Sequence, residues 1–242
     1  MRTQDLSIDV DGKSMPCYLA GPHGDDPRPA VIVFQEIFGV NREVKRIAEL
    51  FASAGYLALA PNYYYRTHPS LNEPYNEEGL KAGFAAAGEV TRANLRRDLL
   101  GCIEWLNAQA YVANGKIGTC GFCYGGTVAF LSATIPGLRA AVCFYGGAIA
   151  APLASGEPEA LADAKDVRVP LLLFFGGKDD YIPRAEVERI DRTLTELGKP
   201  HEVVTYPNVG HAFFRESSAA LNKEEVADAW ERVQHFLKKN LA

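Results

Sequence analysis

The stretch KIGTCGFCYGG, residues 116–126, decides the fold class. An apolar run leads into Gly-x-Cys-x-Gly, which has the spacing of a nucleophile elbow, Gly-x-Ser-x-Gly, with cysteine in the serine position. In such an elbow a strand turns sharply into a helix, and the nucleophile sits in a strained backbone conformation at the turn. Gly121 and Gly125 flank Cys123 because a Cβ at either position would collide with the neighbouring strand or helix. The stretch therefore predicts a strand, a tight turn and a helix starting at Tyr124.

Further strands and helices alternate on both sides of this stretch. Apolar runs without alternation suit strands that are buried on both faces of a parallel sheet, and they occur at 30–34, 56–60, 140–145, 170–175 and 201–206. Stretches with a helical period or helix start and stop signals lie at 42–54, 95–106, 183–197 and 223–241. Two β-like runs, 6–10 and 15–20, are joined by Asp11-Gly12 and predict a hairpin. The order predicts an α/β fold with a mostly parallel central sheet and helices on both faces.

Composition narrows the class of protein and its partners. The chain has 242 residues, 48% of them hydrophobic, and a formal net charge of −5. These values exclude disorder of the bulk chain and argue against binding to nucleic acid, whose phosphates an acidic protein repels. No apolar run approaches the roughly 20 residues that span a bilayer, and the N-terminal residues lack the apolar core of a signal peptide. Five irregularly spaced cysteines fit a reducing compartment, so we expect a cytoplasmic location. Because no apolar run could span a bilayer, we expect no membrane partner.

One domain spanning residues 1–242 is expected, with one long irregular connection. Residues 62–90 separate a strand from the next clear helix and carry three consecutive tyrosines, two prolines and several glycines. A connection of this length either covers a site as a lid or is a surface insertion with some helix of its own. Residues 151–168 are a second, shorter case.

Reactive side chains follow four of the predicted strands. Glu36, Cys123, Asp179 and His211 come directly after the runs at 30–34, 116–120, 170–175 and 201–206 or shortly downstream. Ligands of open α/β sheets bind at the carboxyl ends of the strands, so these groups are expected at one edge. The order cysteine, aspartate, histidine matches that of nucleophile, acid and histidine in hydrolases of this architecture. Asp180 competes with Asp179 for the role of the acid.

Each of these residues also has a structural interpretation. Cysteine is usually a core residue, and Cys17, Cys102, Cys120 and Cys143 are interpreted in that way. Asp179 would serve equally as a turn residue or a helix cap, and Glu36 as a solvated loop residue. Cys120 and Cys123 also form a C-x-x-C pair, which leaves thiol redox chemistry open. In a redox protein of this kind the first cysteine should start a helix, whereas here Cys120 ends a strand, which argues against redox chemistry. No second metal-binding pair is present, so a zinc site is not expected.

Four motifs together resemble the dienelactone hydrolases, a branch of the α/β-hydrolase superfamily. They are QEIFGVN (35–41), GFCYGG (121–126), GGKDDYIP (176–183) and GHAFFR (210–215), and the resemblance spans nearly the whole chain. It implies an α/β-hydrolase fold and a Cys-His-Asp triad that opens the lactone ring of dienelactone. Cys123 would be the nucleophile, His211 the base and Asp179 its orienting partner.

The resemblance also implies roles around the triad. Glu36 would contact the resting thiol and help generate the thiolate, and the backbone N–H groups of Ile37 and Tyr124 would form the oxyanion hole. Arg215 would bind a substrate carboxylate.

Other candidates for substrate contact are Lys81, Phe38 and Tyr145. Family enzymes that act on dienelactone use a second arginine and a tyrosine, where this chain has Lys81 and Phe84 in the stretch 79–84. A lysine does not reproduce the bidentate grip of arginine on a carboxylate.

We therefore expect a cysteine-dependent hydrolase of a small, anionic lactone or ester that needs no metal or organic cofactor. A carboxylesterase or thioesterase of the same fold, a C-x-x-C redox protein and a catalytically silent homologue are the alternatives.

Overall fold

A single eight-stranded sheet organises the chain, for which a computed structural model describes residues 1–24 and 26–242. The strand order is β1-β2-β4-β3-β5-β6-β7-β8. Strand β2 runs antiparallel to both of its neighbours, β1 and β4, and all other neighbouring pairs are parallel. The strands are β1 (Arg2–Val10), β2 (Lys13–Gly21), β3 (Arg28–Phe34), β4 (Leu57–Pro61), β5 (Val112–Phe122), β6 (Ala140–Phe144), β7 (Leu171–Gly176) and β8 (His201–Tyr206). The prediction of a mostly parallel α/β fold is confirmed.

The first two strands form the predicted hairpin. Asp11 and Gly12 both have positive φ values, 55° and 74°, which is the backbone conformation of the two central residues of a type I′ turn. This turn matches the right-handed twist of the strands and sets the register, in which Val10 faces Lys13.

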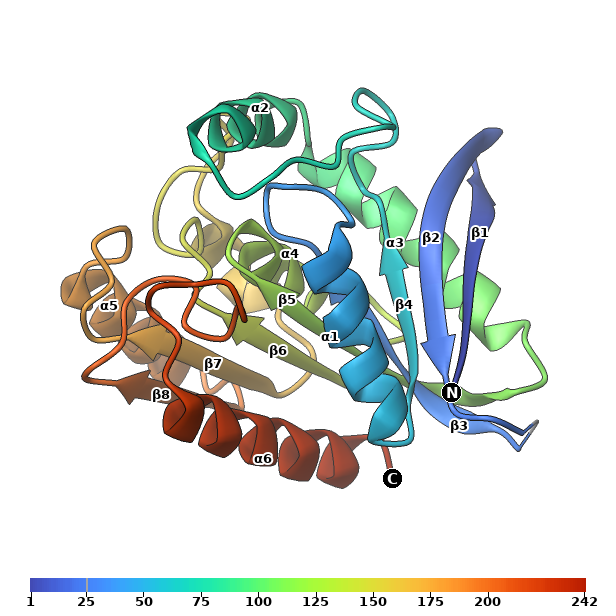
Figure 1. The fold of residues 1–242 in the computed structure, drawn as a ribbon. Coiled ribbons are helices and arrows are strands. Elements are labelled where there is room, and N and C mark those ends of the chain that lie inside the picture. The colour runs from blue at the N-terminus through green and yellow to red at the C-terminus, as the bar shows by residue number, and fades with distance from the viewer. Residues whose placement is uncertain (25) are drawn as a thin grey trace.

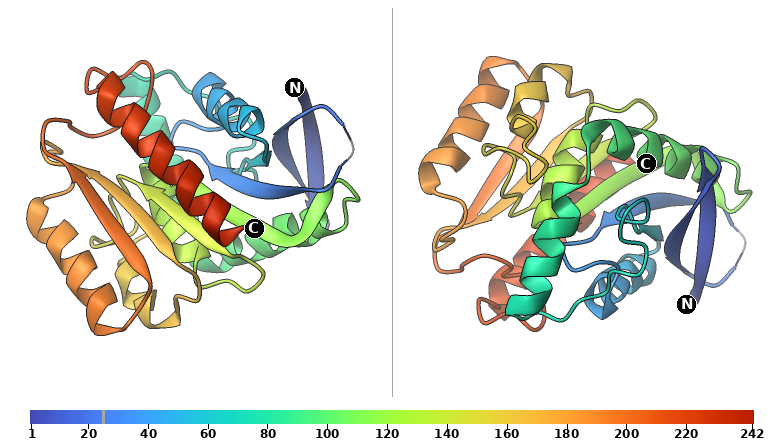
Figure 2. Two further views of the ribbon diagram at one scale, coloured as in Figure 1. Left: turned by 90° about the horizontal axis from the view of Figure 1, so that it is seen from below. Right: turned by 90° about the horizontal axis from the view of Figure 1, so that it is seen from above.

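Helices cover both faces of the sheet (Figures 1 and 2). The helices are α1 (Arg42–Ser53), α2 (Glu77–Gly88), α3 (Arg92–Asn107), α4 (Tyr124–Ser132), α5 (Arg184–Glu196) and α6 (Lys223–Asn240), with a 3₁₀ turn, η1, at Ala160–Asp166. Helices α1 and α6 lie on one face, and α3, α4 and α5 lie on the other. All nine residues of α4 are buried, so the helix that follows Cys123 is held on every side. None of the helices in the described part of the chain is both long and apolar enough to cross a membrane.

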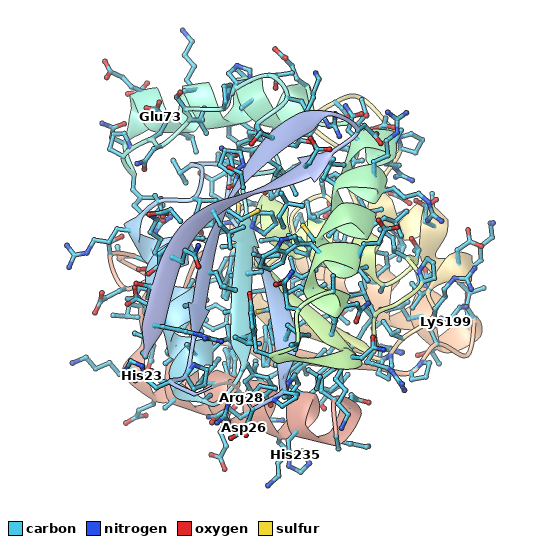
Figure 3. All side chains as sticks on the ribbon, turned by 90° about the vertical axis from the view of Figure 1, so that its right-hand side faces the viewer. His23, Asp26, Arg28, Glu73, Lys199 and His235 are labelled. Carbon is cyan, nitrogen blue, oxygen red and sulfur yellow. The ribbon has the colours of Figure 1, made fainter. Side chains whose placement is uncertain are left out.

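The segment 62–90 lies at the carboxyl ends of the parallel strands. Figure 1 shows α2 across this edge of the sheet. Figure 3 shows Glu73 of the same segment at the opposite end of the molecule from Arg28, where β3 begins. The segment is fixed at its start, because Arg66 and the Tyr65 hydroxyl both bond the buried carboxylate of Asp98, at 2.6 and 2.9 Å.

Candidate active site

Cys123 occupies a strained turn between β5 and α4. Its backbone has φ 55° and ψ −121°, a conformation that costs a non-glycine residue on the order of 1–3 kcal/mol. Its N–H donates to the carbonyl of Phe144 on the neighbouring strand at 3.0 Å. A Cβ on Gly121 would lie 1.9 Å from the Gly125 oxygen, and one on Gly125 would lie 2.5 Å from the Phe34 oxygen. Both glycines are therefore required by close backbone contacts, as the elbow spacing predicts.

The structure brings the thiol, an imidazole and a carboxylate into one line. His211 Nε2 lies 3.2 Å from Cys123 Sγ, and His211 Nδ1 lies 2.8 Å from Asp179 Oδ2. The other carboxylate oxygen of Asp179 accepts backbone N–H bonds from Tyr181 at 2.8 Å and Ile182 at 3.2 Å. These bonds fix the buried Asp179 side chain, whereas Asp180 is exposed. Of the two candidate acids, the structure therefore places Asp179 against the imidazole.

The imidazole has an unusually high affinity for a proton. Burial disfavours its charged form, but the charge of Cys123 and the hydrogen bonds to Asp179 and Cys123 outweigh burial and raise the pKa of His211 to about 10. A protonated His211 next to the sulfur stabilises a thiolate and can later give its proton to a leaving group. The Cys123 side chain is partly exposed, so a small molecule can reach the sulfur.

The two residues whose backbone N–H groups are expected to form an oxyanion hole lie near Cys123. Ile37 and Tyr124 line the same cavity as Cys123. Tyr124 is the first residue of α4, so its N–H has no acceptor within the helix and lies at the positive end of the helix dipole. The loop that holds Ile37 packs under α2, because a Cβ on Gly83 would lie only 2.5 Å from the Ile37 oxygen. Contact between α2 and this loop thus fixes the position of the Ile37 N–H.

Glu36 forms an ion pair with Arg215. Arg215 Nη1 donates to Glu36 Oε2 at 3.3 Å, and the guanidinium lies 4.1 Å from the centre of the Tyr75 ring. Burial raises the pKa of the Glu36 carboxyl, while the charges of Arg215 and His211 oppose this rise. In this structure the thiol is hydrogen-bonded to His211 and the Glu36 carboxylate to Arg215. A contact between Glu36 and the resting thiol stays a prediction.

A cavity of about 540 Å³ encloses these groups. The segment 62–90 contributes Tyr75, Asn76, Leu80 and Phe84, and the stretch 147–154 contributes Gly147, Ala148, Pro152 and Ala154. Glu36, Ile37, Phe38, Cys123, Tyr124, Tyr181, His211, Ala212 and Arg215 complete the lining. Most of the wall is apolar, and the charged groups meet at the Glu36–Arg215 pair and the Cys123–His211 pair.

Two predicted substrate contacts lie elsewhere, and Phe38 lies in the lining as expected. Lys81 is exposed and lies outside the lining. Leu80 and Phe84 share the face of α2 that meets the cavity, and Lys81, the residue after Leu80, points about 100° away from Leu80 around the helix axis. Tyr145 is fully buried, with its ring 5.1 Å from that of His211, so it supports the imidazole from behind. Sequence reasoning missed Tyr75 and Tyr181; the position of Tyr181 two residues after Asp179 was the one available signal.

The remaining cysteine of the C-x-x-C pair is inaccessible. Cys120 is completely buried in β5, and burial raises the pKa of its thiol. All five cysteines are free. In the part of the chain that the structure describes, no group of three or more His, Cys, Asp or Glu side chains could hold a metal ion.

Comparisons with known proteins agree with this architecture. The model of the dienelactone hydrolase family matches residues 15–241. A Synechocystis sp. protein named for carboxymethylenebutenolidase is 36% identical over 226 residues, which cover 93% of this chain and 91% of that protein. A protein of the same name from Escherichia coli K12 is 32% identical over 96% of this chain and 85% of its own length.

A crystal structure assigned to a dienelactone hydrolase from Klebsiella pneumoniae superposes with a TM-score of 0.89 at 31% identity, covering 98% of each chain. A more distant likeness, an acylaminoacyl peptidase from Pyrococcus horikoshii at 17% identity and a TM-score of 0.77, shares the fold. That structure is matched over 99% of this chain and 42% of its own length. The chain belongs to the dienelactone hydrolase family, within the α/β-hydrolase superfamily.

Proposed function

We propose that this protein hydrolyses a small, anionic lactone or ester through an acyl-cysteine intermediate. The Cys123 sulfur attacks the carbonyl carbon, the C–O bond of the leaving group breaks, and the leaving oxygen takes the proton from His211. A water molecule then attacks the thioester, gives a proton to His211 and releases the acid and the Cys123 sulfur. The relatives named for carboxymethylenebutenolidase make a lactone the first substrate to test.

The observation that carries this proposal is the line of contacts from Asp179 through His211 to Cys123. The two hydrogen-bond distances, 2.8 and 3.2 Å, fall within the range expected for a nucleophile, its base and the group that orients the base. The carboxylate fixes the tautomer of the imidazole and stabilises its charged form. The N–H groups of Ile37 and Tyr124 then bind the oxyanion, and each such donor is typically worth about 3–4 kcal/mol.

Arg215 is the group we assign to the carboxylate of the substrate. It lines the cavity, and its side chain, paired with Glu36, is partly exposed. With Lys81 outside the cavity, Arg215 is the one lysine or arginine side chain among the described residues of the lining. This favours a substrate whose carboxylate is bound by one cationic side chain. It disfavours dienelactone, for which the family enzymes described above use two arginines.

The other assignments follow from this chemistry. Glu36, next to Arg215, has a raised pKa and can exchange a proton at the charged end of the cavity. Within one domain of 242 residues, the segment 62–90 serves as a wall of the site. A reactive cysteine remains reduced most readily in the cytoplasm. No metal or organic cofactor is required for acyl transfer to a thiolate.

A pair of cysteine variants tests the proposal. With 4-nitrophenyl acetate as a general substrate, Cys123→Ala should lose at least about 1,000-fold in kcat, whereas Cys120→Ala should keep most of the activity. Equal losses in both variants would favour dithiol chemistry over acyl transfer. Full activity in Cys123→Ala would exclude Cys123 as the nucleophile.

A further inference from the structure

Two exposed aromatic side chains stand at the mouth of the cavity. Among the described residues, the exposed large hydrophobic side chains are Met1, Phe84, Tyr181 and Leu197. Two of these four, Phe84 at 52% exposure and Tyr181 at 66%, also line the cavity that contains Cys123. Apolar side chains left exposed around a pocket are typical of a surface that a ligand covers.

Tyr181 lies next to the imidazole of His211. Its ring is 5.2 Å from the ring of His211, centre to centre, in an edge-to-face arrangement. Its backbone N–H is bonded to Asp179, so the tyrosine is held next to the triad and not on a free loop. His211 has to reach the oxygen of the departing alcohol in order to protonate it, so that alcohol passes beside Tyr181.

Phe84 faces the same opening from α2. It follows Leu80 by four residues, which puts both side chains on the face of the helix that lines the cavity. The preceding Gly83 packs directly against the Ile37 carbonyl, so α2 contacts the loop that holds Ile37. We call this loop the oxyanion loop, after the role proposed for the Ile37 N–H. Ala148, Pro152 and Ala154 continue the apolar lining. The large exposed hydrophobic side chains of the lining are thus aromatic, whereas its charged pair, Arg215 and Glu36, is largely buried.

From this division we infer that Phe84 and Tyr181 form an apolar subsite for the alcohol half of the substrate. The inference rests on the proposed function and specifies its substrate class: an ester with a carboxylate on the acyl half, bound at Arg215, and a bulky apolar alcohol, such as an aromatic one. The cavity of about 540 Å³ holds the volume of about 18 water molecules, enough for both halves at once.

Half-esters of succinate separate the two ends of the site. Monomethyl and monobenzyl succinate share the acyl half and have alcohols of similar acidity, so they differ mainly in the apolar group. Wild-type protein should favour the benzyl ester by roughly tenfold or more in kcat/KM, and Phe84→Ala and Tyr181→Ala should each remove roughly fivefold of that preference. Both variants should lose less in kcat/KM with the methyl ester than with the benzyl ester. Leu197→Ala, a loss of an exposed apolar side chain outside the cavity lining, is the matched control and should leave both rates unchanged.

A third substrate tests which half of the ester the subsite takes. Monomethyl phenylsuccinate carries its ring on the acyl half and should lose less than twofold on Phe84→Ala or Tyr181→Ala. Equal wild-type rates for the methyl and benzyl esters would overturn the subsite, and so would a larger loss for the phenylsuccinate than for the benzyl ester. In either case, Cys123-dependent turnover of the methyl ester would still support the proposed function. Turnover of neither an ester nor a lactone by the wild type would overturn both.

Discussion

His211 and Cys123 are in hydrogen-bond contact: Nε2 lies 3.2 Å from Sγ, and the charge of Cys123 is one of the causes that raise the pKa of the imidazole to about 10. A neutral alanine in place of the cysteine removes that charge. Burial then acts against the imidazolium, and fewer favourable interactions, among them that with Asp179, oppose it.

The pKa of His211 should therefore fall in Cys123→Ala. The wild-type imidazole should stay protonated through neutral pH and titrate near pH 10, because a raised pKa means that the proton is lost only as the pH rises through that value. In Cys123→Ala the titration should move to lower pH. NMR titration of the His211 ring signal checks both values, and the same titration in the two proteins would show that the sulfur does not interact with the imidazole.

Loss of Arg215 should affect anionic substrates far more than neutral ones. A charged hydrogen bond is worth about 1.5–3 kcal/mol, so Arg215→Gln should raise KM for monomethyl succinate by roughly 10- to 150-fold. The KM for methyl propionate, which lacks the carboxylate, should rise by less than about threefold. Steady-state kinetics with both esters measures the difference. An equal rise for the two substrates would remove the carboxylate-binding role.

The contact between α2 and the oxyanion loop should be sensitive to a single methyl group. A Cβ at position 83 would lie 2.5 Å from the Ile37 oxygen, whereas one at position 88 meets nothing closer than 3.5 Å. Gly83→Ala should therefore cost about 1–3 kcal/mol in free energy of unfolding and displace the Ile37 N–H, lowering kcat by at least about tenfold.

Gly88→Ala, in the same helix, is the control for Gly83→Ala. Its stability should stay within about 0.5 kcal/mol of wild type, and its kcat should be unchanged. Urea unfolding and ester hydrolysis report the two effects. Equal kcat values for the two variants would mean that α2 does not position the oxyanion loop.

Local sequence signals were sufficient for the sheet and the elbow. The apolar runs mark β3 to β7 because those strands are largely buried, whereas the edge strand β8 is buried only at Tyr206. Gly121 and Gly125 are set by backbone contacts that leave no room for a Cβ. Helix α2 was anticipated only as one alternative, some helix without bounds inside the stretch 62–90. Its sequence, EEGLKAGFAAAG, contains three glycines, and glycine is a poor helix former, so tertiary contacts such as Gly83 on Ile37 have to hold it.

The orientation of side chains within the site could not be predicted from local sequence. Lys81 and Phe84 are three residues apart, and only a helix at this position, in this rotation, decides that Phe84 borders the cavity and Lys81 does not. Asp179 and Asp180 are chemically identical neighbours. The backbone N–H groups of Tyr181 and Ile182 donate to Asp179, and these bonds distinguish it from Asp180. The pairing of Glu36 with Arg215 joins residues 179 positions apart, which no local pattern reveals.

The central claim is that the acyl group is transferred to one particular sulfur. Wild-type protein is quenched with acid during turnover of 4-nitrophenyl acetate, digested so that Cys120 and Cys123 fall in separate peptides, and analysed by mass spectrometry. The acetyl group should appear on the peptide with Cys123 and not on the peptide with Cys120. In Cys123→Ala the acetyl group and the turnover should both disappear. An acetyl group found on another residue that turns over with the substrate, or hydrolysis that survives in Cys123→Ala, would contradict the account.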